Sequence, residues 1–234
     1  MSKIFQFSTI GALMAGYFVA EHRLADYCPS HAFGLGCSTE ISAEITLFEG
    51  IAYEAAAGEP LHPFAANSCV PFVQVTDFEA EQQHSVTNIT HQNAPQWLAR
   101  FTLPQNIFLA VLIEGTFEEL VIRRPQRVAE HSRHDVKEMA ATQQVDTHHD
   151  IAGRLIGFWT PELYGRISVP RFHFHFLDRD KKISGHVLQF HAEQATLSFQ
   201  EKQTIEITQP SSLAYKELKI SLGALDALIG KIEK

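Results

Sequence analysis

The clearest pattern in the chain is a strict alternation of phenylalanine and histidine. Phe172, Phe174 and Phe176 alternate with His173 and His175. A period of two predicts a β-strand, because successive side chains of a strand point to opposite faces. The phenylalanine face is expected to pack into a core, and the other face then carries two imidazoles.

A polar run and then a second apolar run follow this strand, which predicts a β-hairpin. If the turn is centred between Asp180 and Lys181, His175 lies directly opposite His186. Directly opposite residues share a face, with Cβ atoms about 4.5–5.5 Å apart. His173, His175 and His186 then converge on one point, whereas a slip of one residue would move His186 to the other face.

Three neutral imidazoles suit Zn²⁺, Mn²⁺, Fe²⁺, Ni²⁺ or Cu²⁺. Three protein ligands leave coordination positions open for water or substrate, which is the pattern of catalytic metal sites. The alternative is a solvated sheet face that happens to carry histidines. A third histidine in register favours the metal site over that alternative.

The remaining pattern predicts many strands and few helices. The expected strands are residues 5–7, 41–47 with Glu44 in the middle, 51–53, 70–78, 107–114, 117–123, 151–159, 195–199 and 204–208. Two further hairpins are expected, joining 107–114 to 117–123 and 195–199 to 204–208. Helices are expected from Ser8 or Thr9 to Phe18 and within residues 211–234.

Strands that outnumber helices and follow each other through short turns predict an α+β fold. We expect two mixed or antiparallel β-sheet subdomains with a few flanking helices. A polar stretch around residues 126–150 divides residues 1–126 from residues 127–234, and the two parts are expected to act as one functional unit. His131, His134, His148 and His149 in or near this stretch are expected at the surface.

Composition narrows the class of protein. The chain has 234 residues, 45% of them hydrophobic, and a net charge of −8. No basic cluster is present, which argues against nucleic acid as a partner. Three widely spaced cysteines do not form a disulfide pattern, so reduced thiols in the cytoplasm are expected. The apolar residues 10–20 imitate a signal peptide but lack a suitable cleavage site, and they are too short to span a membrane.

Several segments resemble one enzyme family. They are residues 5–16 (FQFSTIGALMAG), 33–36 (FGLG), 157–161 (GFWTP), 169–176 (VPRFHFHF) and 185–188 (GHVL). In these segments, and over nearly the whole chain, the sequence is similar to the alpha-acetolactate decarboxylases. The histidine strand with its Gly-His-Val-Leu return is the most specific of them.

This resemblance implies a function and a set of residues. It implies decarboxylation of 2-acetolactate to acetoin and CO₂, in a usually dimeric protein of two α/β parts. His173, His175 and His186 match the zinc ligands of the family.

Three further residues match parts of the family's active site outside the hairpin. Glu44 matches a carboxylate beside the metal, and Arg123 matches the active-site arginine. Glu233 is the nearest counterpart of a glutamate near the family's C-terminus.

The chain also differs from the family. Cys37 stands where threonine is usual, Gln189 where aspartate is usual, Ala43 where glycine is common, and Arg124-Pro125 departs from the segment after the arginine. The departures at Cys37 and Gln189 keep open a family member that holds metal but is inactive. A zinc-bearing binding module, for example for nucleic acid, is a separate alternative that the net charge of −8 opposes.

A different three-histidine metalloenzyme, either a cupin-like dioxygenase or a carbonic-anhydrase-like hydratase, is a third alternative. The cupin motif needs a glutamate where this chain has Arg179 or Asp180, which counts against a cupin.

Overall fold

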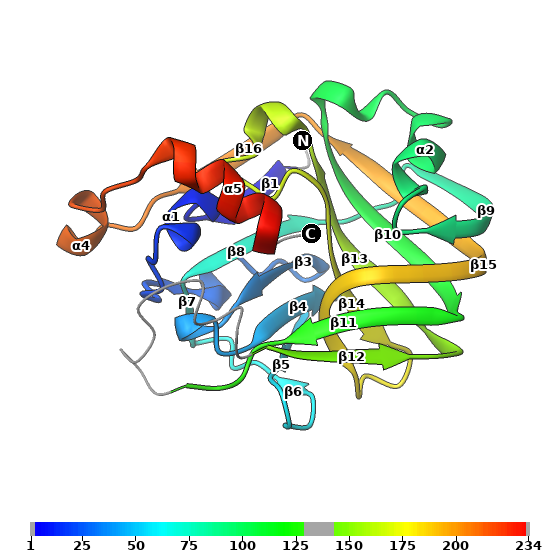
Figure 1. Cartoon of the computed structure of the whole chain (residues 1–234), viewed down its shortest axis with the longest axis horizontal. Coiled ribbons are helices and arrows are strands. Elements are labelled where there is room, and N and C mark those ends of the chain that lie inside the picture. Colours follow the sequence, from blue (N-terminus) through cyan, green and yellow to red (C-terminus); the bar gives the residue numbers. More distant parts are fainter. Residues whose placement is uncertain (1–2, 129–142, 233–234) are drawn as a thin grey trace.

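The structure, a computed structural model, describes residues 3–128 and 143–232. Within them the chain folds into two seven-stranded sheets, a small two-stranded sheet and short helices (Figure 1). The expected α+β class, with mixed and antiparallel sheets and few flanking helices, is confirmed. The division into residues 1–126 and 127–234 stays a prediction.

The first sheet is assembled from both ends of the chain. All its neighbouring strands are antiparallel except β1 and β16, which are parallel. Its strand order is β16 (Thr204–Thr208), β1 (Lys3–Phe7), β8 (Phe72–Asp77), β3 (Ala32–Cys37), β4 (Glu44–Phe48), β5 (Ile51–Ala55) and β6 (His62–Pro63).

The second sheet carries the histidine hairpin and is antiparallel throughout. Its strands are β10 (Phe108–Phe117), β13 (Ile151–Thr160), β14 (Arg171–Asp178), β15 (Ser184–Lys202), β11 (Glu119–Arg124) and β12 (Gln144–His148), with β9 (Gln82–Thr90) paired to β15. Strand β15 is 19 residues long: its first part pairs with β14 and β11, and its last part with β10 and β9. Because β10, β13 and β14 are neighbours in turn, β15 closes them into a ring.

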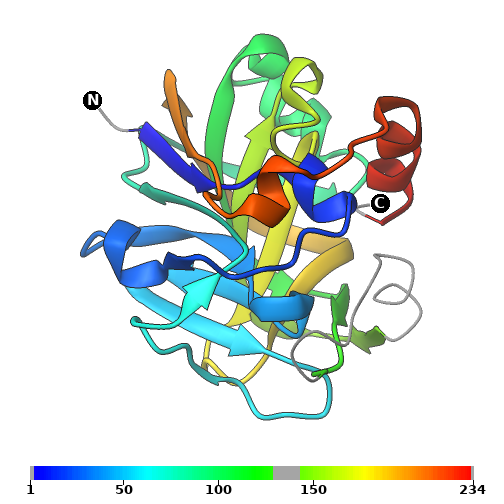
Figure 2. The ribbon, with the colours of Figure 1, turned by 90° about the vertical axis from the view of Figure 1, so that its left-hand side faces the viewer.

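Short helices flank the sheets, and α1 and α5 lie together at one side of the molecule (Figures 1 and 2). The α-helices are α1 (Ile10–Met14), α2 (Ala94–Ala99), α4 (Leu213–Lys216) and α5 (Leu222–Ile232). The 3₁₀ turns are η1 (Leu24–Tyr27), η2 (Thr39–Ile41), η3 (Pro104–Asn106) and η4 (Glu162–Tyr164), and β2 (His22–Arg23) pairs with β7 (Cys69–Val70). No helix in the described ranges is long and apolar enough to cross a membrane.

Two of the expected hairpins are wrong. Strand β11 does not pair with β10, because β13 and β15 occupy both edges of β10. It pairs with β12 and β15 instead. After β15 the chain passes from the second sheet to the first, where β16 pairs with β1 and not with β15.

The strand expected over residues 41–47 begins only at Glu44. Glu40 and Ile41 have positive φ angles of 60° and 48°, which are incompatible with an extended strand. The preceding residues form η2 instead. Glu44 is therefore the first residue of β4 and not its middle.

The two faces of β14 contribute to different cores. Phe174 and Phe176 pack inside the ring of strands with apolar residues of β10, β13 and β15. On the opposite face, Ile156 and Phe158 of the neighbouring β13 pack against residues of the first sheet such as Phe33. His173 and His175 share this second face, so they lie in the layer between the two sheets.

Candidate metal centre

The turn of the histidine hairpin is held by one aspartate. The carboxylate of Asp178 accepts hydrogen bonds from the backbone nitrogens of Asp180 at 3.1 Å and of Lys182 and Ile183 at 2.6 Å each. Lys181 takes the positive φ of 58° that the turn requires. The ladder then pairs His175 with His186, which confirms the predicted register.

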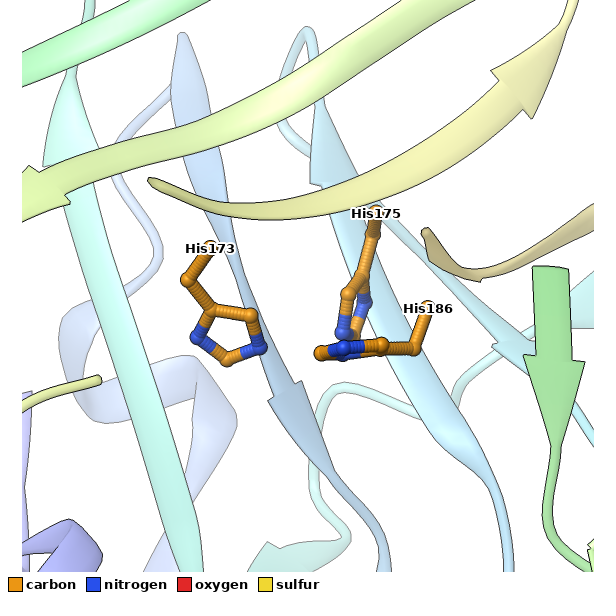
Figure 3. Close-up of side chains that lie close together, drawn as sticks. All are labelled: His173, His175 and His186. Carbon is orange, nitrogen blue, oxygen red and sulfur yellow. The ribbon is translucent and has the colours of Figure 1, made fainter. Parts of the chain in front are cut away.

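The three histidines point toward one another (Figure 3). The centroid of the His173 ring lies 5.0 Å from that of His186 and 5.4 Å from that of His175, and the His175 and His186 centroids are 5.6 Å apart. One nitrogen of each ring lies within 4.8 Å of the others. All three side chains are buried. The sequence therefore predicted this convergence correctly.

Burial keeps the three imidazoles neutral. Loss of hydration, and then the charge of Arg123, lowers the pKa of His173 to about 3. The pKa values of His175 and His186 are also well below the usual range, for the same main reason. Neutral imidazoles are the form that binds a metal ion.

The hydrogen bonds of His175 fix which of its nitrogens carries the proton. Its Nδ1 lies 3.0 Å from the carbonyl oxygen of Ile45, which can only accept a hydrogen bond. Nδ1 must therefore carry the hydrogen, and Nε2 carries the lone pair. The Nε2 atom lies 3.4 Å from Oε2 of Glu44, which is buried at the start of β4.

This donor set fits a divalent cation. The His175 Nε2 and Oε2 of Glu44 are both buried and lie 3.4 Å apart, and both are atom types that coordinate divalent cations. The cavity beside them has a volume of about 30 Å³, more than the roughly 10–15 Å³ that one water molecule needs. Three nitrogen donors within 4.8 Å of one another also match the usual ligand set of zinc and related metals.

Arg123 lies at the same cavity, and Arg124 does not. Arg123 pairs with His186 across β11 and β15, is 6% exposed and lines the cavity with the three histidines. The next side chain of a strand points to the opposite face. Arg124 accordingly forms an ion pair of 2.7 Å with Asp146 of β12. Of the two adjacent arginines, Arg123 is the one at the candidate site.

The structure brings five of the six candidate residues to one cavity. Glu233, the sixth, lies outside the described residues, as do His131 and His134. His148 is half-buried in β12, and His149 is exposed beyond it. Within the described ranges, the three-histidine group is the only cluster of potential metal ligands.

Sequence reasoning did not identify the apolar wall of the cavity. It is formed by residues of α1, β3, η2 and β8, with Gln143 near them: Ile10, Leu13, Met14, Gly36, Cys37, Ile41 and Phe72. The apolar residues 10–20 that imitate a signal peptide thus contribute to this wall through α1. Cys37, one of the departures from the family, is part of the wall, whereas Gln189 is exposed, pairs with Val121 of β11 and does not line the cavity.

Comparison with known proteins gives a consistent result. A sequence model of the family described as alpha-acetolactate decarboxylase matches residues 4–222. The alpha-acetolactate decarboxylase of Klebsiella aerogenes is 26% identical over 233 residues, covering 99% of this chain and 89% of that protein. That of Bacillus licheniformis is 24% identical over 213 residues, covering 91% of this chain and 84% of the relative.

Solved structures share the fold over almost the full length. The crystal structure of alpha-acetolactate decarboxylase from Bacillus subtilis strain 168 has a TM-score of 0.93 at 22% identity and covers 99% of both chains. A Staphylococcus aureus protein of unknown function, described as similar to alpha-acetolactate decarboxylase, has a TM-score of 0.92 at 25% identity and covers 98% of this chain and 99% of its own. Since the family sequence model matches nearly the whole chain, this protein belongs to the alpha-acetolactate decarboxylase family.

Proposed function

We propose that this protein decarboxylates 2-acetolactate to acetoin and CO₂. The observation that carries this proposal is the convergence of His173, His175, His186, Glu44 and Arg123 on one buried cavity, in a chain of this family. Acetolactate has a keto group β to its carboxylate, so loss of CO₂ leaves an enolate. An active site for this reaction must stabilise that negative charge and then supply a proton to carbon.

We propose that His173, His175 and His186 hold Zn²⁺, although another divalent transition metal suits the same ligands. Three neutral nitrogen donors leave positions for two substrate oxygens. A bound divalent cation supplies Lewis-acid stabilisation of the developing negative charge without an organic cofactor. The Glu44 carboxylate beside His175 adds negative charge that favours a cation at this position.

Arg123 is proposed to bind the substrate anion. The net charge of the chain is −8, so attraction of an anionic substrate needs a local positive charge. Arg123 is buried at the cavity, where its guanidinium can form two hydrogen bonds with a carboxylate. Its neighbour Arg124 cannot take this role while it is paired with Asp146.

Glu44, Glu233 and Arg123 are proposed as the set that delivers or orients the proton that the enolate carbon receives. Glu44 is buried at the cavity, and a carboxyl group in such a place is suited to donate or orient a proton. Glu233 enters this proposal only through its match to the family's C-terminal glutamate.

We further propose a homodimer in the cytoplasm, acting on a small molecule with no nucleic-acid partner. The dimer follows from the family resemblance. The cytoplasm is supported by the lack of a disulfide among Cys28, Cys37 and Cys69. The negative net charge supports the absence of a nucleic-acid partner.

The test is to incubate the purified protein with racemic acetolactate and to measure acetoin, CO₂ and bound metal. We expect about one zinc per chain and acetoin formation, with both lost in His175→Ala. Metal-loaded protein that forms no acetoin would refute the decarboxylase and favour the inactive family member that holds metal. Full activity of Arg123→Ala, with Arg124→Ala as its matched control, would refute the role of Arg123.

A further inference from the structure

Two buried hydroxyl groups lie next to Nδ1 of His175. Thr46 Oγ1 is 3.3 Å from His175 Nδ1 and 2.9 Å from Ser184 Oγ. Thr46 is fully buried, and Ser184 and His175 are each 1% exposed. Thr46 belongs to β4 of the first sheet, whereas Ser184 begins β15 of the second.

The chemistry of the partners gives the hydrogen bonds at His175 Nδ1 a direction. His175 Nδ1 carries a hydrogen, because its other partner is the Ile45 carbonyl oxygen at 3.0 Å. Thr46 Oγ1 can therefore only accept from Nδ1, as the longer branch of a shared hydrogen bond. Thr46 therefore faces the imidazole with a lone pair. Either hydroxyl can donate in the 2.9 Å bond between Thr46 Oγ1 and Ser184 Oγ.

We propose that Thr46 and Ser184 are positioning residues that hold the His175 imidazole in its Nδ1–H form, with Nε2 directed at the metal position. This inference rests on the proposed metal-dependent function. Groups that fix the second nitrogen of a metal-binding histidine commonly change metal affinity by about 10- to 100-fold. The hydroxyl pair would also fix the distance between β4, which carries Glu44, and the histidine hairpin.

A different result is expected if the two hydroxyl groups have only a structural role. Buried Thr46 and Ser184 could fill space and satisfy each other without affecting His175. In that case, replacement by a side chain of equal shape would change stability and leave zinc affinity unchanged. Thr46→Val is such a replacement, because valine keeps the β-branched shape and loses only the hydroxyl.

The chain offers a matched control in Thr76. This threonine is 2% exposed in β8 of the same sheet, and its hydroxyl donates to the Lys3 carbonyl oxygen at 2.8 Å, away from the histidines. Thr76→Val therefore removes one buried hydroxyl hydrogen bond without touching the site. Thr46→Ser is the rescue variant, because it keeps the hydroxyl and loses only a methyl group.

The experiment measures zinc affinity of the full-length protein by competition with a chromophoric chelator. We expect Thr46→Val to bind zinc about 10- to 100-fold more weakly than wild type. Thr46→Ser should stay within about three-fold, and Thr76→Val should match wild type. Ser184→Ala should weaken binding less than Thr46→Val. The double variant should be no weaker than Thr46→Val alone, because both hydroxyls act along one chain of hydrogen bonds.

A second measurement separates zinc binding from folding. The melting temperature of each variant is recorded with chelator and with zinc. Thr46→Val and Thr76→Val should both melt earlier in chelator, but only Thr46→Val should lose part of the increase caused by zinc. Equal zinc affinity of wild type and Thr46→Val would overturn the positioning role of Thr46 and leave the proposed function intact. A wild-type protein that binds no zinc would overturn both.

Discussion

Gly157 is the position where the smallest change should disturb the histidine strand most. It lies in β13, opposite Phe174 of β14. A Cβ atom added at Gly157 would lie 1.9 Å from the carbonyl oxygen of His173 and 2.8 Å from Cδ1 of Phe174. Ordinary contacts between carbon and oxygen are about 3.3 Å or longer. The two strands would therefore have to separate by more than an ångström in Gly157→Ala.

The size of the expected destabilisation in Gly157→Ala depends on which atoms the added methyl group contacts. Overpacking of a core typically costs about 1–3 kcal/mol when side chains can move aside. Here the nearest atom belongs to the backbone of β14, which β13 and the hairpin hold on both sides, so we expect a loss of about 3 kcal/mol. For a domain of this size that corresponds to a melting temperature lower by about 6–12 °C. The displaced carbonyl belongs to His173, so zinc affinity should fall as well.

Urea unfolding of Gly157→Ala and Gly223→Ala tests this reasoning. Gly223 is the matched control, because it is exposed near the start of α5 and an added Cβ meets nothing within 4 Å. We expect the control to unfold like wild type or slightly later, since alanine is the better helix former. A free energy of unfolding of Gly157→Ala within about 0.5 kcal/mol of wild type would refute the close contact between β13 and β14 at this position.

Three further outcomes are expected. In the presence of chelator, the free energy of unfolding should fall by about 2 kcal/mol from His173 alone when the pH is lowered from 7 to 5. The pKa of His173 is about 3 in the folded state and 6.5 in the unfolded state, so the unfolded state takes up the proton first and is stabilised as the pH falls. A flat profile would contradict the neutral buried imidazoles. Arg124→Ala should lower the free energy of unfolding in urea by no more than about 1 kcal/mol, because the ion pair of Arg124 with Asp146 is partly exposed. This variant should form acetoin at the wild-type rate, and a loss of activity would contradict the exclusion of Arg124 from the site. Chelation should abolish acetoin formation but leave the far-ultraviolet circular dichroism unchanged, because large apolar cores hold the sheets; unfolding on chelation would show that the metal is structural.

The predictable part of the site is the part that depends on short sequence distances. The register of His175 and His186 depends on a turn of a few residues, and the alternation of phenylalanine and histidine assigns the faces of β14. Local pattern cannot show which edge a strand will occupy. The expected hairpin of β10 and β11 fails because β13 and β15 already pair with both edges of β10. The pairing of β1 with β16 joins the two ends of the chain, and no local turn predicts it.

The rest of the site could not be derived from spacing, because it comes from the other sheet. Glu44 lies 129 positions before His173 in the sequence, and only the family resemblance associated the two. The left-handed conformation of Ile41, which brings this residue into the wall of the cavity, also has no sequence signal. A β-branched residue with positive φ is disfavoured, so a pattern-based prediction extends the strand through it.

The site is therefore a property of the contact between the sheets. The second sheet supplies the three imidazoles on strands held by a closed ring. Strand β4 of the first sheet presents the Glu44 carboxylate, the Ile45 carbonyl oxygen and the Thr46 hydroxyl, all directed at His175. Because these three groups are consecutive along one strand, a shift of β4 would change the charge, the tautomer and the orientation of His175 together. Substitutions in the apolar layer between the sheets should then weaken metal binding without touching a ligand. Phe158, fully buried there beside Phe33, is the residue where that coupling is expected to be largest.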